Sequence, residues 1–511
     1  MGYLKRHVKD WAESTTAHGW SELARAQTKC SLCVWGTLLA WCTVTLIVIT
    51  VLSVRSFIAP PYFTRTSNII RNDSLLYPDI KICNFNRFSR EKAEQTNLTD
   101  TLMRQYLLNL FGTNNYILPS DQRTLMDQDV NERVDAWMKE HNFTLADVFT
   151  ELGHECFPTI LKIMSQGTDA YEYMCASGDY ENEYVKIRQV LDPTFGLCWI
   201  IQPAKDEYRH TDRAGASGGI SLLLYVDPLD TLLEPYNNYW ETGLAMFFGE
   251  SDDFIPLSPG ARTWVALEPQ ESVFGYWAAN NPYNRPCVKS REPLLWPGSQ
   301  WTQGSNYKCK YECEAYYKFA QYVNCSGVTP GIDYPSCDAR QMNLGMYHQY
   351  LNWNDSELNS LRDECVRKRC LPLCHEVSYK PTVTSTKLLA EPMAEMIGNL
   401  ISASNDTASQ QMFPTPEGIR ERLIMVDVYF PNMDVLYFYT YNRQDFSEFL
   451  SQLGGQLSLW SGISWITVFH LIFTLLIPLC CPCLWCTSKV GDEQDESEVL
   501  HGDVKQAVGM K

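Results

Sequence analysis

The stretch LSQLGGQLSLWSGISWITVFHLIF (residues 450–473) decides the fold class of this 511-residue chain. It lies inside an uncharged run, residues 449–488, in which His470 is the only titratable side chain besides cysteine. The run is rich in glycine and serine, although each glycine weakens a helix by about 1 kcal/mol. A segment that only anchors a protein in lipid gains more from leucine. The composition therefore indicates a membrane helix with a second role.

On a helix, the small residues of this stretch share one face, because they are spaced four, three and four positions apart. They are Ser451, Gly455, Ser458 and Gly462. Such a stripe suits either close packing between helices or the lining of a narrow aqueous path. The run is about twice as long as one straight crossing requires, and Gly-Ile-Ser at residues 462–464 offers a place to break the helix. A broken backbone at membrane depth is tolerated where it faces protein or water, which favours the aqueous path.

A second apolar run lies near the amino end. Residues 32–54 carry no charge, and as a helix they span about 34 Å, enough to cross a bilayer. The run lacks a cleavage site and is too long for a signal-peptide core, so it predicts a retained signal anchor. The leader is net positive, which favours a cytoplasmic amino terminus. The predicted segments are a cytoplasmic leader (1–31), a first membrane helix (32–54), an extracellular domain (55–448), a second membrane helix (449–479) and a cytoplasmic tail (480–511).

Cysteines and glycosylation sequons support that topology at a plasma membrane, with both termini in the cytosol. Twelve of the 19 cysteines lie between the two runs, an even number that suits a closed set of disulfides in an oxidising compartment. Zinc is the rival explanation for the cluster at residues 309–374, but the location and the missing Cys-x-x-Cys pairs argue against a metal. All six Asn-x-Ser/Thr sequons lie in the same segment, at Asn72, Asn97, Asn142, Asn324, Asn354 and Asn405.

Other cysteines lie next to the membrane-spanning runs on the predicted cytoplasmic side. They are Cys30, Cys33, Cys480, Cys481, Cys483 and Cys486. Reversible acylation is the functional interpretation of such positions, and simple apolar filling is the alternative. The sequence does not choose between the two.

Charge and motifs exclude several classes of function. The net charge is −18, and most of it lies between the two apolar runs, where it concentrates cations and repels nucleic acid. An acidic exterior also serves solubility alone. We find no Gly-x-Ser-x-Gly, no His-Glu-x-x-His and no phosphate loop, and His154 and His375 are lone histidines beside a carboxylate. The sequence therefore predicts neither an enzyme nor a cofactor.

The segment between the runs is predicted to be an α+β domain with a central β-sheet and peripheral helices. Strand-like stretches are residues 77–85, 219–227, 422–430 and 434–442. The last two are separated by Pro-Asn-Met and predict a hairpin. Apolar spacings of three and four predict helices at residues 98–111, 131–143 and 357–368.

Five motifs in this order resemble the degenerin, epithelial sodium channel and acid-sensing channel superfamily. They are HGW (18–20), YPDIKICNFN (77–86), FGLCWIIQP (195–203), CLPLC (370–374) and LGGQLSLWSGIS (453–464). The resemblance covers nearly the whole chain. It implies a trimer of two-crossing subunits that forms a sodium-preferring channel, blocked by amiloride-type compounds, with sodium as the permeant ion.

The resemblance also implies roles for individual residues. The filter would be Gly462, Ile463 and Ser464, the pore lining and gate Ser451, Gly455 and Ser458, and the gating loop His18 and Gly19. Tyr62 and Tyr283 would couple the membrane helices to the extracellular domain, and Glu250, Asp252 and Asp253 would form an acidic pocket for protons or calcium. The implied disulfides are Cys83–Cys198, Cys156–Cys175, Cys287–Cys374, Cys309–Cys370, Cys313–Cys365 and Cys325–Cys337.

Three departures from the family pattern bear on selectivity and on the stimulus. His470 stands where many relatives carry glutamate, and an imidazole cannot supply the same anionic ring. Gln452 stands where acid-sensing members often have aspartate, and no histidine follows the first crossing. We therefore expect opening by an extracellular neuropeptide of the FMRFamide type, bound by the aromatic and helical segment from about residue 95 to 190.

Four alternatives stay open. The channel could be gated by protons, gated mechanically or constitutively open. The most distant alternative is a two-anchor receptor that is not a channel, whose anchors would need no stripe of small residues. An ATP-gated channel would need clustered lysines on its exterior, which is acidic here.

Overall fold

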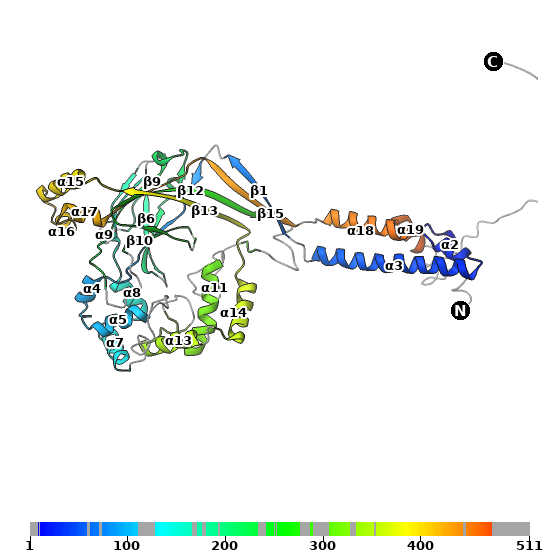
Figure 1. Cartoon of the computed structure of the whole chain (residues 1–511), viewed down its shortest axis with the longest axis horizontal. Coiled ribbons are helices and arrows are strands. Elements are labelled where there is room, and N and C mark those ends of the chain that lie inside the picture. The colour runs from blue at the N-terminus through cyan, green and yellow to red at the C-terminus, as the bar shows by residue number, and fades with distance from the viewer. Residues whose placement is uncertain are drawn as a thin grey trace, which may run out of the picture. The chain divides into compact units, whose positions relative to one another are not determined.

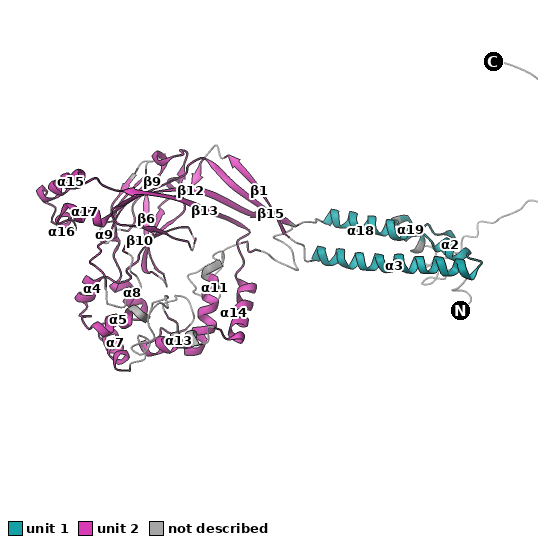
Figure 2. Ribbon diagram, viewed as in Figure 1, with its two compact units in different colours: residues 1–61, 443–511 teal, residues 62–442 magenta. Residues whose placement is uncertain are grey.

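The computed structural model describes residues 9, 11–58, 62–70, 74–110, 128–165, 171–175, 180–192, 195–232, 242–249, 251, 253–275, 287–289, 306–327, 334–351, 354–442 and 446–472. The chain forms two compact units, residues 1–61 with 443–511 and residues 62–442 (Figure 2). We describe each unit by itself.

The first unit is helical. Its described helices are α2 (Trp20–Arg25), α3 (Lys29–Ile58), α18 (Phe446–Ser461) and α19 (Trp465–Leu471). Among the described residues, α3 is the one helix long and apolar enough to cross a membrane. Within it, the hydroxyls of Thr43 and Thr45 donate to the carbonyls of Leu39 and Trp41, over 2.7 and 2.9 Å. These two hydroxyls are thus satisfied within the helix itself.

The apolar segment near the carboxyl end, predicted as a membrane helix at residues 449–479, forms two helices. The first, α18, begins at Phe446, and the segment is interrupted between Ser461 and Trp465. The predicted break at residues 462–464 is therefore present, and residues 473–479 lie outside the described part. Helices α3 and α18 run side by side (Figure 1).

The second unit contains two large sheets where the sequence predicted one. The eight-stranded sheet has the order β1-β15-β12-β14-β9-β4-β5, with β13 paired to β12, and the five-stranded sheet has the order β11-β10-β3-β7-β6. The strands of the larger sheet are β1 (Tyr62–Ile70), β4 (Ile160–Ser165), β5 (Tyr171–Tyr173), β9 (Ile220–Tyr225), β12 (Ala261–Phe274), β13 (His375–Lys387), β14 (Leu423–Tyr429) and β15 (Asp434–Asn442). Those of the smaller sheet are β3 (Ile80–Asn84), β6 (Val185–Asp192), β7 (Gly196–Pro203), β10 (Leu244–Phe248) and β11 (Ile255–Leu257), and β2 (Leu75–Leu76) pairs with β8 (His210–Thr211).

The main hydrophobic core draws side chains from both sheets. Trp199 and Met246 come from the five-stranded sheet, and Leu222 and Val426 come from the eight-stranded sheet. All four are buried. One apolar face of a sheet must be covered by a second layer, and here each sheet supplies that layer for the other.

The predicted hairpin of residues 422–430 and 434–442 is wrong. Strands β14 and β15 both pair with β12 in parallel, β14 with Arg262–Ala266 and β15 with Gln270–Phe274. The chain therefore continues in the same direction past Pro431 and does not reverse. The long strand β12 offers one edge to both segments in turn, and these ladders take the hydrogen bonds that a hairpin would have made.

The helices of the second unit lie along one side of the sheets and at one end of them (Figure 1). They are α4 (Arg90–Gln95), α5 (Thr101–Leu110), α7 (Gln128–Glu140), α8 (Leu145–Leu152), α9 (Cys156–Thr159), α11 (Asn306–Ala315), the π-helical turn η3 (Tyr316–Ala320), α12 (Gln321–Val323), α13 (Ala339–Leu351), α14 (Ser356–Arg369), α15 (Glu391–Ala403), α16 (Thr407–Met412) and α17 (Pro416–Arg422), with short 3-10 turns at Asp206–Arg209 and Ala216–Gly218. The three helices expected from apolar spacing are present as α5, α7 and α14. The apolar faces of α5 and α7 pack in a second core, which includes Leu107, Val134 and Phe149 of α8. Helix α14 contributes Cys365 to a separate cluster of buried cysteines.

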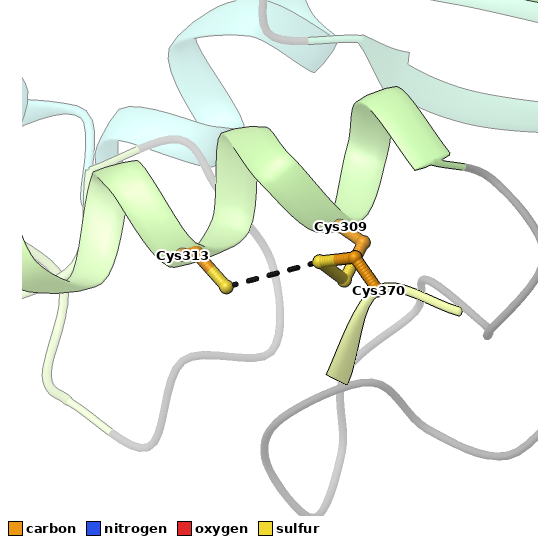
Figure 3. Close-up of side chains that lie close together, drawn as sticks. All are labelled: Cys309, Cys313 and Cys370. Carbon is orange, nitrogen blue, oxygen red and sulfur yellow. Dashed lines mark hydrogen bonds between the residues drawn. A yellow bond between two sulfur atoms is a disulfide. The ribbon is translucent and has the colours of Figure 1, made fainter. Parts of the chain in front are cut away.

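Six disulfides join the same partners that the family resemblance implies: Cys83–Cys198, Cys156–Cys175, Cys287–Cys374, Cys309–Cys370, Cys313–Cys365 and Cys325–Cys337. The sulfur atoms of Cys309, Cys313 and Cys370 lie within 4.8 Å of one another (Figure 3), as in a metal site. Each of these sulfurs is already bonded to another sulfur, so none is a free thiolate that could bind zinc.

Candidate functional site

The break between α18 and α19 is built from two standard helix ends. Gly462 has a φ of +65°, a conformation that glycine adopts freely, and its N–H donates to the carbonyl of Ser458 over 2.9 Å. Ser464 is extended, and its hydroxyl accepts from the N–H of Thr467 at the start of α19. One helix therefore ends at a glycine and the next begins at a serine, as their residue types favour.

The amino-terminal loop packs against this break. The N–H of His18 donates to the carbonyl of Ser461 over 2.9 Å. A Cβ atom added to Gly462 would lie 2.6 Å from the imidazole ring of His18. Gly19 is also left-handed, with a φ of +78°, and a Cβ there would lie 3.0 Å from Leu39. The structure thus brings together two motifs that the sequence showed only separately.

Two hydroxyl residues that sequence reasoning missed join the same site. Thr16 and Thr467 place their Oγ1 atoms 2.6 Å apart, and the Thr467 side chain is buried. The Ser464 and Thr467 pair forms a capping box, with each side chain bonded to the backbone of the other. The Ser-x-x-Thr spacing resembles the known capping signature and could have marked Thr467. Nothing in the sequence marked Thr16.

Large side chains make the contact between α3 and α18. Phe57 stacks on Phe449 with ring centroids 4.2 Å apart. The Gln456 amide donates to the Ser53 hydroxyl over 3.2 Å, and Trp41 meets Trp460 edge to face at 5.6 Å. Phe449, Gln456 and Trp460 therefore form the face of α18 that is turned to α3.

The small residues of α18 lie on its other side. At 3.6 residues per turn, Ser451, Gly455 and Ser458 are opposite the residues that contact α3. All three are exposed in the single chain, and a Cβ added to Gly455 would meet nothing within 4 Å. Packing of this chain's own α3 therefore does not use the stripe.

The residues predicted to couple the helices to the extracellular domain are only partly described. Tyr62 begins β1, and its register partner is Asn442 at the end of β15. Burial raises the pKa of the Tyr62 hydroxyl. Tyr283 lies outside the described residues, so its contact with Tyr62 stays a prediction.

The predicted acidic pocket is described at one position. Asp253 lies in the connection between β10 and β11, which pair in an antiparallel hairpin. Its N–H donates to the Ser251 hydroxyl over 3.2 Å, and its side chain is exposed. Glu250 and Asp252 lie outside the described residues, and binding of protons or calcium there stays a prediction.

The described sequon asparagines are all at the surface, as attachment of a glycan requires. They are Asn97, Asn142, Asn324, Asn354 and Asn405. Asn72 lies outside the described residues. Glycosylation itself stays a prediction.

Comparisons with known proteins place these features in context. A family model described as amiloride-sensitive sodium channel matches residues 11–474, a range that includes both His18 and the break. Acid-sensing ion channel 1 of Gallus gallus is 20% identical over 91% of this chain and 82% of its own length. Acid-sensing ion channel 2 of Homo sapiens is 20% identical over 80% of this chain and 74% of its own length. Degenerin mec-4 of Caenorhabditis briggsae is 24% identical over 56% of this chain and 35% of its own length.

Proposed function

The chain belongs to the amiloride-sensitive sodium channel family, within the degenerin, epithelial sodium channel and acid-sensing channel superfamily, and on that premise we propose that it forms a sodium-preferring cation channel of the plasma membrane. The family is one of ion channels and not of enzymes. The observation that carries the proposal is the break at residues 462–464, which interrupts an apolar segment and is packed by the His18 loop.

In this proposal, the break is the selectivity filter. Residues of an unwound segment no longer use all their carbonyls inside a helix, so Gly462, Ile463 and Ser464 have peptide oxygens to offer a partly dehydrated sodium ion. Three copies of the chain would meet around the axis with the faces that carry Ser451, Gly455 and Ser458. That face is free of α3, which supports its use between copies. Amiloride-type blockers would act in this path.

The proposed topology has two crossings, α3 and the α18–α19 segment, with both termini in the cytosol. The disulfides of the second unit support an extracellular position for residues 62–442, because such bonds persist in oxidising compartments. The three described cysteines without a disulfide are Cys30, Cys33 and Cys42, all in α3. This division fits a cytoplasmic or membrane position for α3. Juxtamembrane acylation of Cys30 and Cys33 remains part of the proposal.

For the stimulus, we favour an extracellular peptide of the FMRFamide type. Two features argue against gating by acid: Gln452 stands where acid-sensing members often have aspartate, and no histidine follows the first crossing. Aromatic side chains in the helical region support a peptide. Trp137, His141 and Phe143 form one such group, with centroids 5.3–5.7 Å apart. Aromatic faces attract cationic peptide groups.

Protons are the second candidate stimulus, and relatives named as acid-sensing channels favour it. One carboxyl in the second unit also suits it, since burial, together with the nearby Asp338, raises the pKa of Asp135. Three further alternatives for opening remain within the proposal. They are binding of calcium at the Asp253 turn, mechanical opening and constitutive opening.

Current recording from oocytes that express the chain tests the proposal. We expect an inward sodium current that an FMRFamide-type peptide evokes, that amiloride blocks and that disappears when sodium is replaced. A current evoked by acid alone would replace the peptide with protons. If biotinylation shows surface expression but no amiloride-sensitive current is recorded at rest, with peptide or with acid, the proposal that the chain alone forms a channel is contradicted.

A further inference from the structure

One hydroxyl group in the site has three polar neighbours. Thr467 lies in the first turn of α19, and only 3% of its surface is exposed to solvent. Its Oγ1 atom is 2.6 Å from the Thr16 hydroxyl and 3.2 Å from the Ser464 hydroxyl, and it accepts from the Ser464 N–H over 3.2 Å. A hydroxyl has one proton to donate and two lone pairs to accept. These three contacts therefore use the whole capacity of the Thr467 side chain.

The same short segment of the amino-terminal loop contacts both sides of the break. Thr16 bonds to Thr467 on α19, and His18 bonds to Ser461 at the end of α18. Ala17 between them is 3% exposed. Residues 16–18, which we call the clamp, therefore hold the end of one helix and the start of the next at a fixed separation.

We propose that Thr467 and Thr16 are positioning residues for ion selectivity. They touch no ion in this proposal. Thr467 fixes the backbone of Ser464 through its N–H, and Thr16 fixes Thr467 to the clamp. Discrimination between sodium and potassium depends on where peptide oxygens are held, and functional geometry is lost when supporting side chains leave it loose by about 0.5 Å. The inference rests on the proposed channel function and adds residues outside both the Gly-Ile-Ser and the His-Gly motifs.

The substitution Thr467→Val tests the proposal, because valine keeps the shape and removes all three hydrogen bonds. Thr467→Ser is the rescue variant, because it keeps the hydroxyl. The reversal potential is measured with sodium outside and again after potassium has replaced it. The shift between the two gives the sodium-to-potassium permeability ratio. We expect Thr467→Val to lower the sodium preference by about twofold or more, since loss of an N-cap partner shifts the capped population by about fivefold. Thr467→Ser is expected to stay close to the unsubstituted channel.

A matched control is available in α3. Thr43→Val makes the same chemical change, but the Thr43 hydroxyl bonds only to the carbonyl of Leu39 in its own helix among the contacts described. Its permeability ratio is expected to stay unchanged. An equal change in Thr43→Val and Thr467→Val would overturn the proposal, because a general effect of lost hydroxyls would then explain both.

A second pair of variants covers the case in which Thr467→Val carries no current. Thr16→Val removes one of the three hydrogen bonds and Thr16→Ser restores it, so a reduced sodium preference in the first and a normal one in the second supports the proposal. Unchanged ratios in conducting Thr467→Val or Thr16→Val channels overturn it and leave the channel function standing. No current from the unsubstituted chain overturns the channel function, and this inference with it.

Discussion

At the scale of single residues, the site depends on two glycines that no other residue replaces easily. Gly19 and Gly462 both have left-handed backbones. A Cβ atom added to either glycine would lie close to atoms of a neighbouring residue. His18 is the neighbour of Gly462. The sequence showed both glycines within motifs, but the packing of His18 on Gly462 joins residues more than 400 positions apart and could not be predicted from spacing.

The substitution Gly462→Ala is expected to reduce the current to less than about a tenth. A left-handed backbone costs an L-residue about 1–2 kcal/mol, every 1.4 kcal/mol is about tenfold in an equilibrium, and the added Cβ would lie 2.6 Å from the His18 ring. The measurement is sodium current per channel at the cell surface. Gly36→Ala is the control, because a Cβ there meets nothing within 4 Å. Equal loss in both variants would contradict the explanation.

A largely buried histidine in the second unit, His154, predicts how stability depends on pH. Burial lowers the pKa of His154, an effect that nearby Lys92 reinforces and the Asp230 carboxylate opposes. The Nδ1 atom of His154 lies 3.5 Å from the Asp230 Oδ2 atom. The unfolded chain therefore takes up this proton first as the pH falls below about 6.5, and folding stability contributed by the neutral imidazole is lost with falling pH.

We expect the melting temperature of the detergent-solubilised full-length protein to fall between pH 7.5 and 5.5. The fall should be smaller in His154→Gln, which cannot take up the proton. His210→Gln, at an exposed position, serves as the control and should keep the full fall. A pH dependence of the same size in His154→Gln would show that other groups account for it.

At the scale of elements, neighbouring disulfides join α11 to the end of α14. Cys313 bonds to Cys365, and Cys309 bonds to Cys370. The sulfurs of Cys313 and Cys370, which belong to different bridges, lie only 3.9 Å apart (Figure 3). A thiolate left free at Cys313 would therefore be within reach of the other bridge and could exchange with it.

The single variant Cys365→Ser is expected to reach the surface less well than the double variant Cys313→Ser/Cys365→Ser. Both lose a bridge worth about 2–4 kcal/mol, but only the single variant leaves a thiol that can attack the Cys309–Cys370 bond. Surface biotinylation and non-reducing gels measure the outcome. The explanation fails if the double variant is the more defective one.

The face of α18 turned away from α3 allows a test of the pore axis. Attachment of a charged thiol reagent to Ser451→Cys should hold the channel open, because bulk at this small position prevents the copies from closing around the axis. The measurement is persistent current after treatment from outside. Leu450→Cys, at an exposed residue turned about 100° from Ser451 around the helix, should respond little. A persistent current only in Leu450→Cys would place the axis elsewhere.

At the scale of the whole molecule, the second unit buries a hydrophobic core between its two sheets, whereas the first unit leaves most of α3 exposed. Its exposed apolar residues include Val44, Ile47 and Val51. Such surface needs lipid or further copies to cover it. The family resemblance implies three copies, and this count stays a proposal.

We expect the deglycosylated protein in detergent to have the mass of three 58.7 kDa chains. Light scattering coupled to size exclusion, corrected for bound detergent, measures it. Gly455→Leu should weaken the assembly, since it adds bulk on the face proposed to lie between copies. A protein mass of one or two chains would contradict the trimer.

The sequence by itself determined the apolar runs, the helices with clear periodicity, the helix break and the glycines that it needs, because these features depend on neighbouring residues. The family resemblance supplied the disulfide partners. Only the tertiary structure decided that β14 and β15 both pair with β12, that two sheets share one core, and that Thr16, His18, Gly462 and Thr467 meet. Several segments of the chain can compete for the same strand edge or the same space in the core. The local sequence pattern of one segment does not determine which distant segment it contacts.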